Sequence, residues 1–307
     1  MAQITATMVR DLREKTGAGM MDCKKALNEN DGDMDASVKF LREKGLAAAA
    51  KKAGRVAAEG LTRIHIMGST AALVEVNCET DFVAKTEDFQ NLVADIATQV
   101  ATSKPSDVAT LLAQAHHGGT GTVNDLITEK ISTIGENLTI RRFSLLEGGN
   151  AFGSYLHMGG NIGVLVELSL SDGIDAENES VKMVAKDLAM QIAASQPQFV
   201  RREEADAKSI EEERSIYRQQ GLDSGKPENI VEKIVDGRIN KWFGEVCLLE
   251  QVWIKDTDMK INKLLAKVSQ ELGGEITVNR FNRYKVGEGI EKRQDDLAAE
   301  VAKMTQG

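Results

Sequence analysis

The chain has 307 residues, a formal net charge of −9, 42% hydrophobic and 28% charged residues. This length and composition exclude a single small module and wholesale disorder, and they predict two or three domains with buried cores. The acidic balance argues against nonspecific nucleic-acid binding as the main activity, because neutralising phosphates requires a basic surface. Residues 1–60 are weakly basic, whereas the remainder is acidic.

The cysteine pattern and the apolar runs indicate the compartment. Cys23, Cys78 and Cys247 are odd in number and far apart, which argues against a disulfide framework and a zinc cluster. No run approaches the roughly 18 apolar residues of a membrane span, and the start of the chain lacks the features of a targeting peptide. We therefore expect a cytoplasmic protein with reduced thiols, no metal, no cofactor and no membrane association.

The first 45 residues predict a module of three short helices, because apolar residues recur at three- and four-residue spacing in three stretches. A glycine-rich turn at Thr16 to Gly19 separates the first two helices, and Gly45 is expected to end the third. Residues 46–58 are rich in alanine and poor in bulky apolar groups. This composition predicts a separate connecting helix.

From Leu61 onward the sequence predicts two copies of a strand-strand-helix unit. At a fixed offset of 92 residues, 13 of the 42 positions from Ile64 to Pro105 match identical residues without a gap. A match that runs through strand, turn and helix favours duplication over chance similarity. We expect an α+β fold with two core subdomains at 59–147 and 148–286, each with an antiparallel sheet.

Between the copies, two helices are expected at about 107–115 and 123–133, followed by a strand at about 136–147. The adjacent residues His116 and His117 lie in the glycine-rich loop between these helices. Adjacent histidines rarely bind one ion without further ligands, and none is placed nearby. A solvated loop is therefore the favoured interpretation.

Residues of about 200–241 are densely charged and carry only a thin apolar stripe, which predicts an antiparallel helical hairpin that protrudes from the second subdomain. A strand near 244–253, a helix at 261–272 and a strand at 275–284 are expected to follow. A C-terminal helical module at 287–307, with its helix at about 292–304, completes the expected fold.

The sequence contains no GxSxG, HExxH or phosphate-loop motif and no GxGxxG after a strand, so we interpret the chain as a binding protein rather than an enzyme. The most informative tripeptide is Thr80-Asp81-Phe82, which follows the second predicted strand of the first copy. The second copy has Asp172-Gly173-Ile174 at these positions. The tripeptide either binds a partner or has a structural role, with Thr80 or Asp81 capping the next helix and Phe82 buried in the core.

Two stretches make the chain resemble the bacterial elongation factor Ts family. They are Leu12–Leu27, which reads LREKTGAGMMDCKKAL, and Glu75–Lys85, which reads EVNCETDFVAK. Shorter similar blocks extend to residues 286–292, so the resemblance covers essentially the whole chain. The loop at 116–122 is longer than usual in the family, and it interrupts neither motif.

The resemblance implies a guanine-nucleotide exchange factor that binds elongation factor Tu in its GDP-bound and nucleotide-free forms, without covalent chemistry, a cofactor or direct contact with nucleic acid. It implies that the Mg²⁺ site and switch region of the partner are disturbed by Thr80, Asp81, Phe82 and Val83. It also implies partner contacts at Arg13, Thr16, Gly17, Met20, Met21, Lys24 and His157. In some relatives the hairpin region serves dimerisation, so a homodimer through the hairpin is a further expectation.

Two alternatives remain open. The first 45 residues resemble a small helical adaptor of the ubiquitin-associated type, so the chain could be a scaffold protein without exchange activity. An enzyme on the duplicated α+β core is the third possibility.

Overall fold

The computed structural model describes residues 4–225 and 227–291, and its helices and antiparallel sheets confirm the predicted α+β class. The chain divides into two compact units. Unit 1 comprises Met1–Thr62, Val74–Phe143 and Lys285–Gly307, and unit 2 comprises Arg63–Leu73 and Ser144–Tyr284. Within the described ranges, none of the helices combines the length and the apolarity that a bilayer span requires.

The N-terminal part of unit 1 consists of three helices, as predicted: α1 Ala6–Thr16, α2 Met20–Glu29 and α3 Met34–Lys52. The side chain of Thr5 caps α1, and Gly17 ends it in the left-handed conformation at φ 64°. The buried residues of this module form one apolar cluster, which consists of Val9, Leu12, Cys23, Ala26 and Leu27.

Helix α3 continues through Gly45 to Lys52, so the prediction that Gly45 ends a helix and that 46–58 form a separate one is wrong. Gly45 is buried, and a Cβ atom placed there would lie 3.7 Å from the Cβ of Ser132 on α7 Val123–Ile134. The side of α3 that carries Gly45 therefore packs against α7. The alanines after it have the highest helix propensity and extend the helix.

Six of the described strands form two three-stranded sheets, and in each sheet the middle strand is the second of its copy. The first sheet has the order β1-β2-β3, with β1 Glu59–Met67, β2 Thr70–Cys78 and β3 Thr139–Glu147. The second has the order β4-β5-β8, with β4 Ala151–His157, β5 Ile162–Leu170 and β8 Ile276–Lys285. Strands β4 and β5 are antiparallel, with Ala151 opposite Leu168 and His157 opposite Ile162.

The helices that follow the two pairs of strands lie at the offset of the predicted repeat. Helices α5 Glu87–Ser103 and α8 Glu179–Ser195 begin and end 92 residues apart, as do β2 and β5. Both helices end at a non-glycine residue in the left-handed conformation, Lys104 and Gln196, each at φ 49°. The duplication therefore extends to the backbone geometry of the helix ends.

The repeat continues beyond the stretch that the sequence comparison detected. Helix α7 matches α11 Ile261–Leu272 at an offset of 138 residues, and both end at a left-handed glycine, Gly135 or Gly273. The short helix α6 Val108–Ala113 precedes α7. The offset rises from 92 to 138 because the second copy contains an inserted helical hairpin between α8 and α11.

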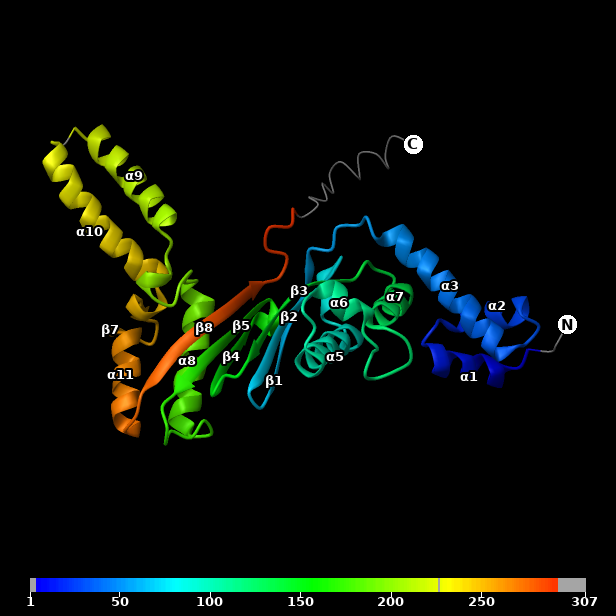
Figure 1. The fold of residues 1–307 in the computed structure, drawn as a ribbon. Coiled ribbons are helices and arrows are strands. Elements are labelled where there is room, and N and C mark those ends of the chain that lie inside the picture. The colour runs from blue at the N-terminus through cyan, green and yellow to red at the C-terminus, as the bar shows by residue number, and fades with distance from the viewer. Residues whose placement is uncertain (1–3, 226, 292–307) are drawn as a thin grey trace. The chain divides into compact units, whose positions relative to one another are not determined.

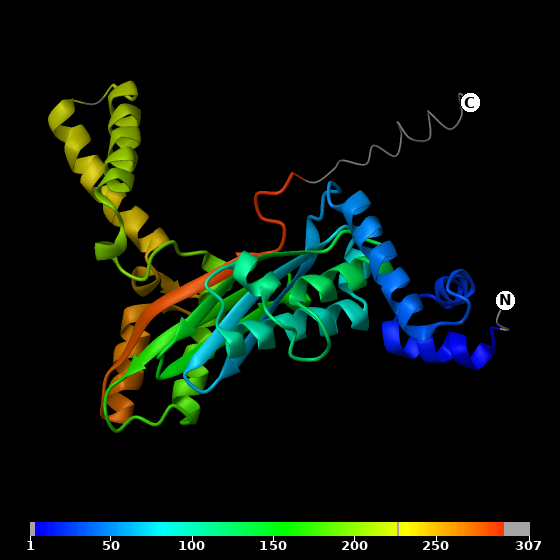
Figure 2. The same cartoon turned by 45° about the vertical axis from the view of Figure 1, so that its right-hand side comes forward.

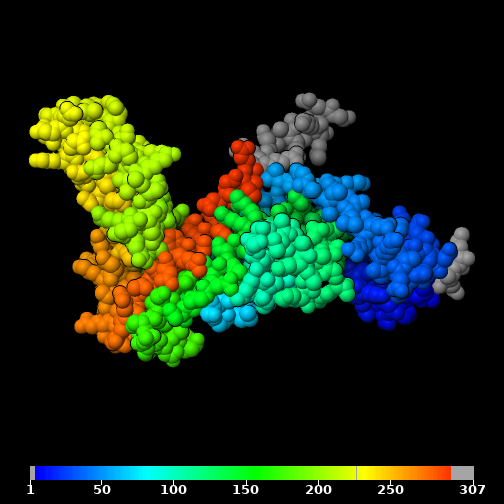
Figure 3. Space-filling view, viewed as in Figure 1, coloured from blue at the N-terminus to red at the C-terminus, as the bar shows by residue number. Residues whose placement is uncertain are grey.

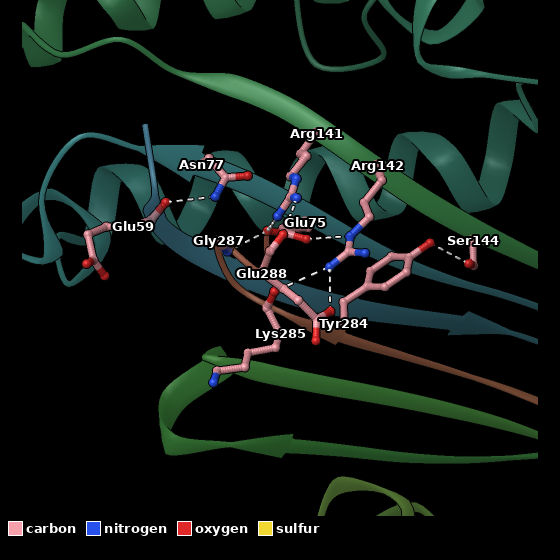
Figure 4. Close-up of polar contacts among 10 residues, drawn as sticks. All are labelled: Glu59, Glu75, Asn77, Arg141, Arg142, Ser144, Tyr284, Lys285, Gly287 and Glu288. Atoms are coloured by element: carbon pink, nitrogen blue, oxygen red, sulfur yellow. Dashed lines mark hydrogen bonds and ion pairs between the residues drawn. The ribbon is translucent and has the colours of Figure 1, made fainter. Parts of the chain in front are cut away.

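A buried carboxylate joins the strands of the first copy. Glu75 on β2 is fully buried, and its oxygens accept from Arg141 Nη1 at 3.0 Å, from Arg142 Nε at 2.6 Å and from the backbone N–H of Gly287 at 2.9 Å. Figure 4 shows both guanidinium groups pointing at this carboxylate. The charge is paired and hydrogen-bonded, as a buried carboxylate requires.

The second copy repeats this arrangement at Glu167, the residue that corresponds to Glu75. Asn279 Nδ2 donates to Glu167 Oε1 at 3.1 Å, and Arg280 Nε donates to Glu167 Oε2 at 2.5 Å. Arg280 corresponds to Arg142 at the 138-residue offset. The two copies thus place the same charge pair between the same two strands.

The predicted hairpin is formed by α9 Ala207–Asp223 and α10 Glu228–Val246, which lie side by side in both ribbon views (Figures 1 and 2) and in the space-filling view (Figure 3). Two ion pairs cross between the helices, Arg214–Asp236 at 2.5 Å and Arg218–Glu232 at 2.6 Å. The hairpin has its own apolar cluster, which consists of Val231, Val235, Ile239, Trp242, Phe243, Val246 and Cys247.

The strand predicted at 244–253 is wrong over most of its length. Helix α10 continues to Val246, and a 3₁₀ turn covers Leu248–Glu250. Within 244–253, only β6 Val252–Trp253 forms a strand, which pairs with β7 Asp256–Lys260. The apolar residues Val235, Ile239, Trp242 and Val246 recur at three- and four-residue spacing and belong to the hairpin cluster, which holds the end of α10 in the helix.

The remaining predictions have mixed outcomes. The helix at 261–272 and the strand at 275–284 are confirmed by α11 and β8. The helix at about 292–304 lies outside the described residues. The subdomain boundaries at 59–147 and 148–286 stay a prediction, as do the boundaries of the terminal modules.

Candidate functional site

The segment Thr80–Val83 follows the buried strand β2 and enters the four-residue helix α4 Asp81–Ala84. Thr80 is the N-cap of this helix, and its hydroxyl accepts a hydrogen bond from the N–H of Val83 at 3.3 Å. Phe82 is 79% exposed. The alternative that Phe82 is buried in the core is therefore wrong. Thr80 does act as a cap, but of the short helix α4, whereas Thr86 caps the longer helix α5 Glu87–Ser103 that was expected after the loop.

Asp81 and Lys85 form an ion pair beside the exposed ring. Lys85 Nζ lies 2.5 Å from Asp81 Oδ2 and 6.0 Å from the centroid of the Phe82 ring. The hydrogen bond from Lys85 lowers the pKa of the Asp81 carboxyl group. At neutral pH this loop therefore presents a carboxylate, an ammonium group and an apolar ring on one exposed turn.

A second carboxylate, Glu136, reaches the start of the loop from the connection between α7 and β3. Its Oε2 accepts from the backbone N–H groups of Glu79 and Thr80, each at 3.0 Å, and its Oε1 accepts from the Thr80 hydroxyl at 2.6 Å. In the sequence, Glu136 lies only at the start of the strand expected at about 136–147. The side-chain contact joins residues 56 positions apart, so periodicity gave no signal for it.

The predicted partner-binding residues of the first module lie on α1, on α2 and in the turn between them. Thr16 and Gly17 have local structural roles, because the Thr16 hydroxyl donates to Leu12 O at 2.7 Å and Gly17 ends α1. Met20 and Met21 are 60% and 75% exposed.

The two predicted cationic contacts of this module, Arg13 and Lys24, are also exposed. The module therefore presents methionine side chains and positive charge to solvent, a combination that suits an adaptable protein contact.

The remaining predicted residue, His157, belongs to unit 2 and ends β4. Its Nδ1 lies 3.1 Å from the hydroxyl oxygen of Tyr155, and its side chain is exposed. The next residue, Met158, is 77% exposed and has a positive φ of 49°. Thr80–Val83 thus lie on one loop of unit 1, and His157 lies at the end of a strand in unit 2.

The loop with the adjacent histidines has a structural explanation. The backbone N–H of His117 donates to the buried Gln99 Oε1 at 3.1 Å, and Gln99 Nε2 donates to Ala115 O at 3.2 Å. Across residues 4–225 and 227–291, no group of three or more His, Cys, Asp and Glu side chains is arranged to hold a metal ion.

Comparison with known proteins shows which family the chain is similar to. Residues 79–288 match the family described as Elongation factor TS. Elongation factor Ts of Syntrophotalea carbinolica is 52% identical over 304 residues, which cover 99% of each chain. Elongation factor Ts of Clostridium botulinum strain Alaska E43 is 52% identical over 303 residues, with 98% of each chain covered, and that of Trichlorobacter lovleyi is 48% identical, with 97% covered. The chain belongs to the elongation factor Ts family.

Proposed function

We propose that this chain is a guanine-nucleotide exchange factor that binds elongation factor Tu with GDP and promotes GDP release. The observation that carries the proposal is the exposed Phe82, which one copy of a duplicated fold presents on a capped turn in a chain of this family. An exposed aromatic ring at the end of a buried strand has no role in its own core, and such rings often anchor protein interfaces.

Exchange of this kind requires binding energy and no covalent chemistry. A GTPase holds its nucleotide through a phosphate loop, Mg²⁺ and switch segments, and displacing these elements weakens nucleotide binding. The coupling is reciprocal, so a thousandfold weakening of GDP binding corresponds to about 4 kcal/mol and weakens factor binding by the same ratio. A broad interface is needed to supply this free energy.

The proposed roles follow from the exposed chemistry. Phe82 inserts as the apolar wedge near the Mg²⁺ and switch region of the partner, and Asp81 acts as a hydrogen-bond acceptor beside it. Arg13, Met20, Met21 and Lys24 supply affinity from the first module, and His157 adds a contact from the other unit. The charged groups act chiefly on the rate of encounter.

The test is the release of fluorescent GDP from elongation factor Tu in the presence of substoichiometric factor. The unaltered chain should accelerate release catalytically, whereas an adaptor or scaffold should not. Phe82→Ala should lower the maximal release rate by at least about tenfold, because truncating an interface anchor typically costs about 2 kcal/mol or more. Its thermal midpoint should change little, since the ring makes few contacts with its own chain.

Met183→Ala is the matched control, because Met183 on α8 is also an exposed apolar side chain and lies outside the proposed interface. This variant should release GDP like the unaltered chain. Normal exchange by a folded Phe82→Ala variant would exclude the wedge, and an inactive unaltered chain would favour the scaffold alternative.

A further inference from the structure

The loop that carries Phe82 is held by a carboxylate from a distant part of unit 1. Glu136 follows Gly135, the left-handed end of α7, and its side chain accepts three hydrogen bonds from Glu79 and Thr80. Hydrogen bonds to a charged acceptor are roughly twice as strong as neutral ones. Glu136 therefore fixes the position of Glu79 and Thr80, the residues at which the loop begins.

Glu136 also orients the cap of α4. The Thr80 hydroxyl donates its hydrogen to Glu136, which leaves an oxygen lone pair to accept the N–H of Val83. Helix α4 has only four residues, and a helix this short is unstable without caps and tertiary contacts. The orientation of Phe82 on this helix thus depends on a chain of two hydrogen bonds that begins at Glu136.

The contact is reciprocal, which makes the base of the loop rigid. Glu79 Oε1 accepts from the N–H of Asn137 at 2.6 Å, while the N–H of Glu79 donates to Glu136. Asn137 Nδ2 donates to Arg55 O at 2.8 Å. Residues 79–80 and 136–137 are therefore hydrogen-bonded to each other through both side-chain and backbone groups.

The second copy of the fold is an internal control for this contact. The bond between Glu79 and the N–H of Asn137 corresponds to the bond between Ser171 Oγ and the N–H of Glu275, at 2.8 Å. The residue that corresponds to Glu136 at the 138-residue offset is Gly274. The structural bond is thus present in both copies, whereas the carboxylate occurs only in the copy with Thr80 and Phe82.

We propose that Glu136 is a positioning residue for nucleotide release, which holds Thr80 and α4 so that Phe82 meets the partner in a preformed orientation. This inference rests on the proposed exchange function. Phe82 is mostly exposed, so it makes too few contacts to fix its own orientation. Ordering a loop during association costs free energy, and a preformed loop avoids that cost.

The experiment is a double-mutant cycle with full-length chains, measured as the limiting rate of fluorescent GDP release from elongation factor Tu at saturating factor. Glu136→Ala should lower this rate about tenfold in the unaltered background and change it little in the Phe82→Ala background, because coupled residues are not additive. A purely structural residue would lower the rate by the same factor in both backgrounds.

Two further variants isolate the hydroxyl link in case Glu136→Ala unfolds. Thr80→Val removes the hydroxyl at nearly constant shape and should slow GDP release as Glu136→Ala does. Thr80→Ser retains the hydroxyl and should release GDP faster than Thr80→Val. Amide hydrogen exchange of the free protein should show lost protection at Thr80 and Val83 in Glu136→Ala. The control Ser171→Ala removes the bond of the second copy that corresponds to the bond between Glu79 and Asn137, and it should leave release unchanged.

The outcomes separate this inference from the function on which it rests. If the unaltered chain releases GDP and Phe82→Ala is slow, but Glu136→Ala and Thr80→Val are both fast or the cycle is additive, the positioning role is wrong. If the unaltered chain releases no GDP, the exchange function itself is wrong.

Discussion

At the scale of single residues, buried charged and polar side chains make corresponding hydrogen bonds in the two copies. Glu75 and Glu167 each accept hydrogen bonds from two consecutive positions of the third strand of their copy. Gln99 and Gln191 each donate to one backbone carbonyl and accept from the N–H two residues further on. Such groups are retained because an unpaired buried polar atom costs about 1–3 kcal/mol.

The thiol of Cys78, at the end of β2, is predicted to be unreactive in the folded chain. Burial raises the pKa of Cys78 to about 12, and the nearby Glu136 carboxylate contributes a smaller part of this rise. Only the thiolate is nucleophilic, so alkylation at pH 8 should be at least about a hundredfold slower in the native chain than in urea. Mass spectrometry that resolves each cysteine provides the measurement, and the urea sample provides the control.

The same shift predicts the direction of a pH effect on stability. The pKa of Cys78 is higher in the folded state than the value of about 8.5 in an unfolded chain, so the folded state holds the proton more tightly. Its contribution to stability is complete below pH 8.5 and is lost as the pH rises toward 12. As the pH rises across this range, the Cys78→Ala variant should therefore lose less stability than the unaltered chain. Rapid alkylation of Cys78 in the native chain at pH 8 would contradict both the predicted low reactivity and the predicted pH effect on stability.

At the scale of elements, propensity and periodicity predicted most helices and strands and failed where packing decides. Gly45 was expected to end a helix, but α3 continues through it and packs against α7 there. A strand was expected from about Gly244, but the hairpin cluster, which includes Val246, keeps the chain helical to that residue. In both cases the deciding contact is made by residues distant in sequence, which local patterns do not contain.

Gly45→Ala should raise the free energy of unfolding by about 0.5–1 kcal/mol, because alanine lowers the backbone entropy of the unfolded chain and favours the helix. The added Cβ would lie 3.7 Å from Ser132 Cβ, an ordinary van der Waals distance. Urea unfolding followed by circular dichroism measures the change.

Gly287→Ala is the matched opposite case. Gly287 has a φ of 67°, and a Cβ there would lie 2.1 Å from the carbonyl oxygen of Ala58. This substitution should destabilise the chain. If Gly45→Ala also destabilises it, the contact between α3 and α7 has no room for a methyl group.

At the scale of the whole molecule, the repeat was predictable only in part. The 92-residue offset was visible because 13 identities lie in one ungapped stretch. The second block, from Val123 and Ile261, holds six identities in 24 positions and is displaced by the inserted hairpin, so a fixed offset misses it. The correspondence between Glu136 and Gly274 is likewise recognised only once α7 and α11 are aligned.

The helical hairpin is predicted to be dispensable for the fold of the rest of the chain. Its apolar cluster is separate from the cluster of the second sheet, which is centred on β5, α8 and α11. Arg214 contacts Asp236 across the two helices, so residues 213 and 237 lie at the same level and can be joined by a short linker. Segments with their own core and short end-to-end distance tolerate removal.

Replacing residues 214–236 by a short glycine-serine linker retains the base of the hairpin, where Trp242, Phe243 and Cys247 pack with Phe199 and Arg202 forms an ion pair with Glu250. Calorimetry should therefore show the cooperative unfolding of the remaining chain within a few degrees of the unaltered midpoint, since the removed contacts belong to the hairpin itself. The truncation also removes the exposed apolar residues Ile216 and Ile230, so sedimentation should detect the loss of any homodimer that forms through the hairpin. A truncated chain that unfolds without a cooperative transition would show that the helices are integral to the core, and an unchanged dimer would place the dimer contact on another surface.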